Sequence, residues 1–413
     1  MAHVNETFGN IKASYLFTEI ADRTSAFTEQ NPEVELIRLG IGDTTLPLTQ
    51  TVIDGMHKAV DLMSDPKTYM GYGDERGMRG LREAVASHYE RIATRFPFAT
   101  RFPYPDEVFV NDGAKSDTAG IQTIFSPDSV VAAQDPTYPP YVEAAVMGGK
   151  AGRSIDDRYE GIVYMPCTKE NGFFPEVPSK KVDIIYLCNP NNPTGAVATH
   201  DQLKTFVDYA REHKAVIIHD AAYSGYISDK DLPRTIYQVD GANECAIEIC
   251  SFSKTDGFTG VRLGWTIIPD ELVVEGTEKE EVKQIWGRKQ ATTFNGASNI
   301  AQLAGIAALT PAGQKESQEL IDYYMGNARI IRENLGKLGM EAYGGENAPF
   351  VWVKTPNDLS SWDFFDKLMQ EAHVVGTPGV GFGRQGEGFV RLSAFGARKN
   401  VKEAVERIGQ LKL

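Results

Sequence analysis

A lysine, two serines and an arginine lie close together in one segment of the chain, residues 251–265, which reads SFSKTDGFTGVRLGW. The hydroxyls of Ser251 and Ser253 and the guanidinium of Arg262 are groups that bind a phosphate monoester. Lys254 between them is placed to form a Schiff base with an aldehyde. A lone lysine would be interpreted as a solvated surface residue, but the dense spacing of the four groups favours a binding site.

Two more polar segments follow apolar runs that resemble buried strands. Residues 189–195, NPNNPTG, form a loop stiffened by prolines, in which Asn192 can hydrogen-bond a ligand oxygen. Asp220, followed by Tyr223, ends the next such run, and a carboxylate there is costly unless a group such as a protonated ring nitrogen pairs with it. A structural turn would also explain the loop, and a helix cap would explain Asp220 equally well.

Upstream segments supply two further candidates. Residues 111–116 join an expected strand to an expected helix, and the backbone N–H groups around Ala114 and Lys115 form a phosphate seat at the helix start. Tyr138 lies in another proline-rich loop and is suited to stack on an aromatic ring, although ordinary packing explains it equally well. Because these segments all follow strands, they are expected at one edge of one sheet.

Two other patterns are rejected. Residues 381–386 match the glycine pattern GxGxxG, but a strand-like run follows them instead of the helix that a dinucleotide site needs. The seven histidines show no spacing typical of metal ligands, so we expect no metal.

The elements that must position these groups alternate between strand and helix from residue 105 to about 269. Several strands are continuous apolar runs, which is typical of strands covered on both faces of a parallel sheet. Strands are expected at 107–111, 129–135, 182–190, 215–220, 246–253 and 261–269, with helices between them. The uncharged stretch 291–314 carries polar residues and is expected to be a packed helix, not a membrane span.

The pattern changes after about residue 315, where a long helical stretch leads into strands at 350–354 and 388–395. We expect an α/β protein of three parts. An N-terminal segment, 1–45, packs with the small domain and covers the site; residues 46–315 form a large domain with a mostly parallel sheet; residues 316–413 form a smaller α+β domain.

Composition narrows the function classes. The chain has 413 residues, with 42 Lys and Arg against 56 Asp and Glu, a net charge of −14. This acidic balance argues against binding to nucleic acids or to a membrane surface. The four cysteines have no paired spacing and the N-terminus has no secretory pattern, so we expect a reducing compartment, the cytoplasm, or the plastid stroma if a transit peptide was removed.

The combined motifs resemble the class I and II aminotransferases, a branch of the fold-type I pyridoxal-phosphate enzymes with a seven-stranded type of sheet. The resemblance rests on NPNNPTG, the Asp220/Tyr223 pair, SFSK with Arg262, and Arg391 in VRLS, and it covers nearly the whole chain. Other segments, among them GYGDERG, QDPTYPPY and TPGVGFG, resemble most closely a branch that transfers an amino group between LL-diaminopimelate and 2-oxoglutarate in lysine biosynthesis. One departure is Thr255-Asp256 where Pro-Leu is expected, which bears on the stiffness of the loop.

The resemblance assigns roles to the residues. It implies that pyridoxal 5′-phosphate is held by Lys254, with Asp220 keeping the ring nitrogen protonated, Tyr223 and Asn192 on the phenolic oxygen, and Tyr138 stacked on the ring. The catalytic residues are then Lys254, Asp220 and Tyr223. The phosphate is assigned to Ser251, Ser253, Arg262, Ala114 and Lys115, and the substrate α-carboxylate to Arg391. Substrate contacts are also assigned to Lys115, Tyr138 and Asn192.

A homodimer with shared active sites is implied as well. Tyr72 is expected to reach the phosphate of the neighbouring subunit, and Asn295 is expected to cross the interface to cofactor and substrate. Tyr15 and Gly42 belong to segments expected to close over the substrate. Glu75 is the candidate partner for the distal ammonium of diaminopimelate, although a solvated loop carboxylate explains it as well.

Three alternatives stay open on the residues alone. The first is a general amino-acid aminotransferase that uses aspartate, alanine or aromatic donors. The second is a pyridoxal-phosphate enzyme that performs elimination or cyclisation, because the same lysine serves these reactions. The third is a ligand-sensing protein such as the effector domain of a transcription regulator, for which a preceding winged-helix segment is expected.

Overall fold

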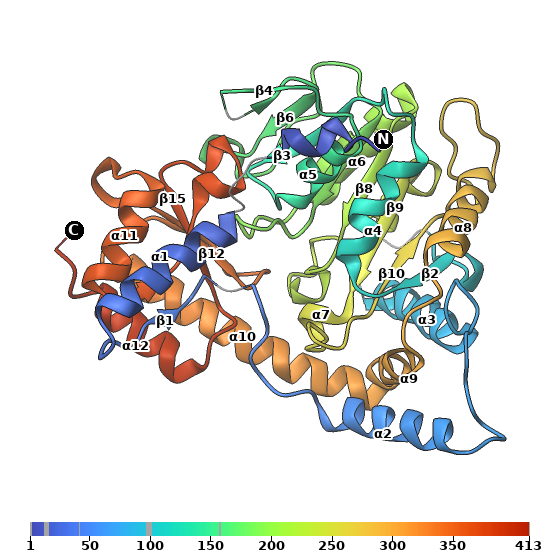
Figure 1. Ribbon diagram of the computed structural model, residues 1–413, viewed down its shortest axis with the longest axis horizontal. Coiled ribbons are helices and arrows are strands. Elements are labelled where there is room, and N and C mark those ends of the chain that lie inside the picture. The colour runs from blue at the N-terminus through green and yellow to red at the C-terminus, as the bar shows by residue number, and fades with distance from the viewer. Residues whose placement is uncertain (1, 12–15, 41, 96–100, 157, 413) are drawn as a thin grey trace.

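The structure is a computed structural model that describes residues 2–11, 16–40, 42–95, 101–156 and 158–412 (Figure 1). Its α-helices are α1 Leu16–Gln30, α2 Gln50–Ser64, α3 Arg79–Arg95, α4 Ala114–Gly120, α5 Pro140–Met147, α6 His200–His213, α7 Phe252–Thr255, α8 Glu281–Thr293, α9 Asn299–Ala308, α10 Pro311–Lys337, α11 Ser361–Glu371 and α12 Arg398–Ile408. Its strands are β1 Ile37–Arg38, β2 Val108–Asn111, β3 Val131–Asp135, β4 Ser154–Ile155, β5 Arg158–Tyr159, β6 Ile162–Pro166, β7 Ile184–Cys188, β8 Val216–Asp220, β9 Ala246–Ser251, β10 Gly264–Ile267, β11 Ala342–Gly344, β12 Phe350–Lys354, β13 Val374–Val375, β14 Thr377–Pro378 and β15 Phe389–Ser393.

A seven-stranded sheet in the order β2-β10-β9-β8-β7-β3-β6 forms the centre of the larger part. The pairs β9-β8, β8-β7, β7-β3 and β3-β6 are parallel, and only β10 runs antiparallel to both its neighbours. The predicted α/β class with a mostly parallel sheet is therefore confirmed.

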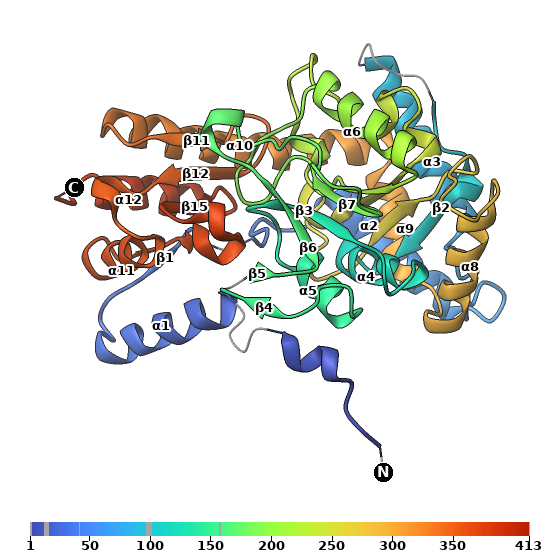
Figure 2. The ribbon, with the colours of Figure 1, turned by 90° about the horizontal axis from the view of Figure 1, so that it is seen from above.

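Both faces of this sheet are buried, because successive side chains of a strand point to opposite sides. Ile217 of β8 packs in one apolar core with residues of α3, α6 and α9, whereas Ile218 packs in a second core with residues of α5 and α8. Figure 2 shows helices on both sides of the strands. This two-sided burial explains the continuous apolar runs in the sequence.

Most predicted strands are present, with shorter bounds. The strand predicted over 246–253 is wrong at its end, because β9 stops at Ser251 and the short helix α7 starts at Phe252. The Ser251 hydroxyl accepts a hydrogen bond from the backbone N–H of Ser253 at 3.0 Å, which caps that helix. Strand β6 was not predicted.

The stretch 291–314 is not one helix, contrary to the prediction. It contains the end of α8, all of α9 and the start of α10, and the Thr310 hydroxyl caps α10 by accepting from the N–H of Gly313 at 3.2 Å. No helix in the described ranges is both long and apolar enough to cross a membrane.

A second sheet, β11-β12-β15-β14, lies at the other end of α10, covered by α11 and α12 (Figures 1 and 2). Strand β1 of the N-terminal segment pairs in parallel with β13 there, through Ile37 with Val374 and Arg38 with Val375. Helix α10 contacts α2, α7 and α9 of the larger part and β11, β12 and α12 of the smaller one. Helix α10 therefore connects the larger part to the smaller one. The predicted domain boundaries at residues 45 and 315 stay predictions.

Candidate active site

Strand register brings the predicted polar segments to one edge of the large sheet. In the parallel strands, Cys188 pairs with Asp220 and Asp220 with Ile249, so the ends of β7, β8 and β9 lie side by side. Strand β10 is antiparallel, so its first residue, Gly264, lies opposite Ser251 and Asn111, the last residues of β9 and β2. Several segments therefore converge at this edge. They are the segments that leave β2, β7, β8 and β9 and the one that enters β10.

A cavity of about 510 Å³ lies at this edge, between the two parts of the molecule. It brings together predicted residues that are far apart in sequence. Those that line it are Gly42, Ala114, Lys115, Tyr138, Asn192, Asp220, Tyr223, Ser251, Ser253, Lys254, Arg262 and Arg391.

Lys254 projects into this cavity from α7, and its Nζ donates a hydrogen bond to the carbonyl oxygen of Gly42 in the N-terminal segment. Burial lowers the pKa of Lys254 to about 8. The positive charges of Arg391 and Arg262 contribute to this lowering, while the carboxylates of Asp43 and Asp220 oppose it. A minor fraction of Lys254 is therefore already a neutral, nucleophilic amine at neutral pH.

Asp220 is buried at the end of β8 and is held by two hydrogen bonds. Its Oδ2 accepts from the hydroxyl of Tyr141 at 2.7 Å, and its Oδ1 accepts from the backbone N–H of Ala222 at 3.0 Å. Burial raises the pKa of Asp220, and the hydrogen bond from Tyr141 opposes that rise. A cation placed in the cavity next to this carboxylate would therefore be bound strongly.

Tyr141 is a site residue that the sequence analysis did not identify. It lies at the start of α5, one helical turn after Tyr138, and its ring stacks on Tyr186 with centroids 4.9 Å apart. The spacing from Tyr138 to Tyr141 was the only signal in the sequence, and it does not reveal the contact with Asp220, which is 79 residues away.

Arg391 comes from β15 of the second sheet and is buried against two aromatic rings. Its guanidinium lies 4.6 Å from the ring centroid of Phe350 and 4.8 Å from that of Phe382. One terminal nitrogen donates to Asn192 Oδ1 at 2.6 Å and the other to the carbonyl of Gly40 at 2.7 Å, whereas Nε has no hydrogen-bond partner among the described residues.

Burial lowers the pKa of Arg391 to about 10, so the side chain stays charged at neutral pH. No carboxylate of the described chain forms an ion pair with it, and a buried, unpaired cation is costly. An incoming carboxylate would remove that cost, so Arg391 suits a substrate carboxylate.

The opposite part of the cavity gathers hydroxyls and cations. Ser251, Ser253, Lys115 and Arg262 line it together. The Arg262 guanidinium packs directly against Gly113, where an added Cβ would lie 2.2 Å from one of its nitrogens and where φ is +111°. Only glycine fits at position 113, and because it has no side chain the guanidinium can enter the site.

Tyr72, Glu75 and Asn295 do not line the cavity of their own chain. Tyr72 is 90% exposed, and the loop that carries Tyr72 and Glu75 is held by Asn299, whose Nδ2 donates to the carbonyl of Gly71 at 2.9 Å. Glu75 and Asn295 are exposed as well, and the predicted action of Tyr72 and Asn295 in a neighbouring subunit stays a prediction. Tyr15 lies outside the described residues.

Comparisons with known proteins agree with this geometry. The sequence model of the family described as aminotransferase class I and II matches residues 34–408. The LL-diaminopimelate aminotransferase of Phocaeicola vulgatus is 49% identical over 412 residues, 99% of each protein. The solved L,L-diaminopimelate aminotransferase from Chlamydomonas reinhardtii is 47% identical, with a TM-score of 0.92 over 98% of each chain. A double mutant of Thermus thermophilus aspartate aminotransferase, 22% identical, shares the fold, with a TM-score of 0.83 over 99% of this chain and 100% of that one.

The lowered pKa of Lys254 can be measured directly. In protein freed of any bound aldehyde cofactor, we expect Lys254, labelled by reductive methylation with ¹³C formaldehyde, to titrate in NMR spectra near pH 8, because burial disfavours its charged form. Solvated lysines should titrate near about pH 10.4. The Lys254→Arg variant identifies the signal by its loss. A midpoint of Lys254 close to that of the solvated lysines would contradict the environment described above.

Proposed function

The chain belongs to the class I and II aminotransferases, and on that premise we propose that it transfers an amino group from L-glutamate to tetrahydrodipicolinate, forming LL-2,6-diaminopimelate and 2-oxoglutarate. The reverse reaction uses LL-diaminopimelate as the donor. The proposal is supported by the two similar LL-diaminopimelate aminotransferases, each aligned over nearly the full length of the chain. It places the enzyme in lysine biosynthesis.

The cavity fits pyridoxal 5′-phosphate, the cofactor that is typical of this family. An amine with a lowered pKa, a buried carboxylate and a set of hydroxyls and cations line the same space. Lys254 would hold the aldehyde, Asp220 the ring nitrogen, and Ser251, Ser253 and Arg262 the phosphate. The strongest support for a phosphate site is Arg262, whose guanidinium reaches the cavity because Gly113 has no side chain to block it.

When bound, pyridoxal phosphate supplies an aldehyde that condenses with amines and a ring that accepts the electron pair left at the substrate Cα. Asp220, which accepts a hydrogen bond from the Tyr141 hydroxyl, would hold the proton on the ring nitrogen. Nζ of Lys254 would move a proton between the substrate Cα and the former aldehyde carbon of the cofactor, which its neutral form near pH 8 allows.

Arg391 binds and orients the substrate. Its guanidinium binds the α-carboxylate through two parallel hydrogen bonds, and Asn192, which accepts from the same guanidinium, keeps it in place. The Phe350 and Phe382 rings around Arg391 exclude water and strengthen this pair. Tyr138 on the cavity wall is placed to stack on the cofactor ring, and Tyr223 to hydrogen-bond its phenolic oxygen.

The observation that carries the function is the joint occurrence of Lys254, Asp220 and Arg391 on one cavity. The test is the profile of amino donors. We expect LL-diaminopimelate to convert the bound cofactor to its amine form in a single turnover, followed by absorbance, and the meso isomer to do so poorly.

The alternatives predict different outcomes of the same measurement. Faster conversion by L-aspartate, L-alanine or an aromatic amino acid would instead identify a general aminotransferase. Products that form without 2-oxoglutarate would indicate elimination or cyclisation. A Glu75→Gln variant, matched by Glu83→Gln on the surface of α3, tests whether Glu75 binds the distal ammonium: KM for LL-diaminopimelate should rise in the first variant only.

Removal of the Tyr141 hydroxyl should weaken the cofactor site. The Tyr141→Phe variant loses a hydrogen bond to a buried carboxylate, worth about 1.5–3 kcal/mol, so we expect pyridoxal phosphate binding to weaken by about tenfold to a hundredfold. The pKa of Asp220 rises further, which shifts the acidic limb of the kcat/KM profile to higher pH. Tyr186→Phe, which removes a hydroxyl bonded to the Thr118 carbonyl, is the matched control. Equal affinities in the two variants would refute the role of Tyr141.

We also propose a homodimer in which Tyr72 and Asn295 complete the site of the partner. Inactive Lys254→Ala and Tyr72→Ala chains, unfolded together and refolded, should form mixed dimers with one intact site out of two. Random pairing then restores about a quarter of the wild-type activity. No recovery, in dimers that light scattering shows to have formed, would place Tyr72 and Lys254 in the same subunit's site.

A further inference from the structure

A second cavity, of about 360 Å³, lies behind the segment that carries Lys254. Ser251 and Ala222 line both this cavity and the active-site cavity, so the two share a wall. Phe252, Thr255 and Asp256 line the second cavity, whereas Ser253 and Lys254 line the first. None of the residues assigned to cofactor or substrate lines the second cavity, apart from Ser251.

One side of the second cavity is apolar. Ile92 of α3, Leu309 after α9 and Ile321 of α10 contribute aliphatic surface. The rings of Phe252 and Trp265, with centroids 5.0 Å apart, add an aromatic surface. A cavity of this size with a mixed lining is typical of sites for small molecules.

Two arginines lie on the same cavity. Arg91 donates to the carbonyl of Leu309 at 3.2 Å, and Arg234 donates to the carbonyl of Ile227. Both also act on His88, which lines the cavity: burial, aided by the two guanidinium charges, lowers its pKa to about 4. The two positive charges therefore act on the same region, while His88 itself is neutral at neutral pH.

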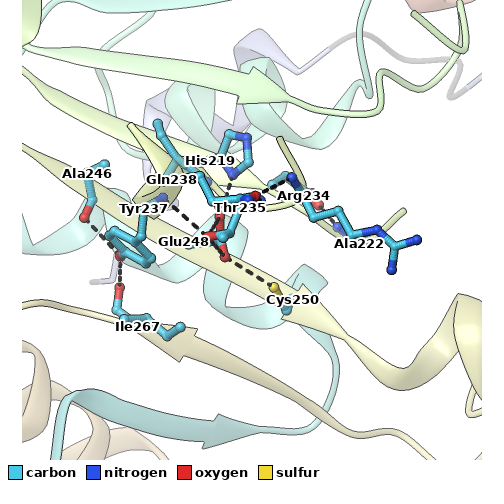
Figure 3. A network of polar contacts seen from close by, with 12 residues as sticks. His219, Ala222, Arg234, Thr235, Tyr237, Gln238, Ala246, Glu248, Cys250 and Ile267 are labelled. Carbon is cyan, nitrogen blue, oxygen red and sulfur yellow. Dashed lines mark hydrogen bonds and ion pairs between the residues drawn. The ribbon is translucent and has the colours of Figure 1, made fainter. Parts of the chain in front are cut away.

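Two acidic side chains of the cavity are already satisfied. Glu248 accepts from the Thr235 hydroxyl at 2.8 Å and bonds His219 Nδ1 at 2.9 Å (Figure 3). It also accepts from the Tyr89 hydroxyl at 2.7 Å and from the Ile236 N–H at 2.9 Å. These donors offset its charge.

Asp256 accepts from the hydroxyls of Ser317 and Thr255, each at 2.5 Å, and burial raises its pKa.

A groove next to this cavity is also rich in arginine. The cavity shares Arg234, Gln318 and other residues with a groove of about 580 Å³ along α10. In that groove Arg329, Arg332 and Arg398 join Arg234, against the two acidic residues Asp322 and Glu346. In a chain with a net charge of −14, such a local excess of positive charge attracts anions to this groove.

We propose that the second cavity is a binding site for a small organic carboxylate with an apolar, preferably aromatic body. The carboxylate pairs with Arg91 and Arg234, and the apolar body lies against Trp265 and Phe252. This site is distinct from the one that binds substrate, because Arg391 does not line it.

Benzoate is the probe, and uncharged benzamide is its control of equal shape. Binding is measured by calorimetry and by the fluorescence of Trp265, on the enzyme loaded with pyridoxal phosphate and saturated with 2-oxoglutarate. We expect benzoate to bind about tenfold more tightly than benzamide, because only benzoate forms charged hydrogen bonds with the arginines. The fluorescence change should be absent in Trp265→Phe.

Variants locate the site. Arg234→Gln should weaken benzoate about tenfold, whereas Arg211→Gln, which changes an exposed arginine paired with Glu244, should not. Gln318 is exposed at the junction of cavity and groove, so Gln318→Glu and Gln318→Lys leave folding intact. The first should weaken benzoate and the second strengthen it, each about threefold at low salt.

Three results would overturn the proposal. They are equal binding of benzamide, displacement of benzoate by 2-oxoglutarate, and unchanged affinity in both Gln318 variants. Arg391→Lys, which spoils the paired hydrogen bonds of the substrate site, should retain benzoate binding. Loss of benzoate in that variant would assign the binding to the active site. These outcomes do not depend on which amino donor the enzyme uses.

Discussion

The burial of an amine and a carboxylate in the same cavity is the constraint on which the site depends. Lys254 and Asp220 follow neighbouring parallel strands, so their distance is set by the sheet and not by a flexible loop. Each charged group must find polar partners there, because isolated buried charges are unstable. Asp220 finds Tyr141 from α5, and Lys254 finds the carbonyl of Gly42 from the N-terminal segment. The cavity is therefore complete only when that segment, which pairs with β13, lies across it.

Buried polar groups lie on both faces of the large sheet. Asp220 and its neighbour His219 point to opposite sides, as successive residues of a strand must. His219 meets Glu248 of β9 at 2.9 Å in the core behind the site (Figure 3). Tyr89 from α3 donates its hydroxyl to the same carboxylate. Every oxygen of Glu248 is hydrogen-bonded, so this buried network is compatible with a stable core and keeps β8 and β9 in register.

Much of this arrangement could be predicted from the sequence, because strand-end segments of a parallel sheet converge. The convergence of Asn192, Asp220 and Lys254 could be predicted from the strand positions and from the rule that ligands bind at the carboxyl ends of the strands. The role of Arg391 could be predicted only from the resemblance to the family, since nothing in the local sequence distinguishes it from a surface arginine. Gly42 was expected to close over the substrate, but its carbonyl contact with Lys254 and the contact of Tyr141 with Asp220 could not be predicted, because they join residues 212 and 79 positions apart. The strand end at Ser251 was missed because a side-chain cap overrides the apolar pattern.

The departure at Thr255 and Asp256 acquires a physical meaning from the structure. A proline after Lys254 would stiffen the loop through its own backbone. Here Thr255 and Asp256 bond each other, and Asp256 also accepts from Ser317 of α10, so the stiffness comes from a side-chain contact with the helix that joins the two sheets. The same helix supplies Ile321 and Gln318 to the second cavity. The lysine segment is thus held by α10 on one side and by the end of β9 on the other, which makes the position of α10 part of the geometry of the active site.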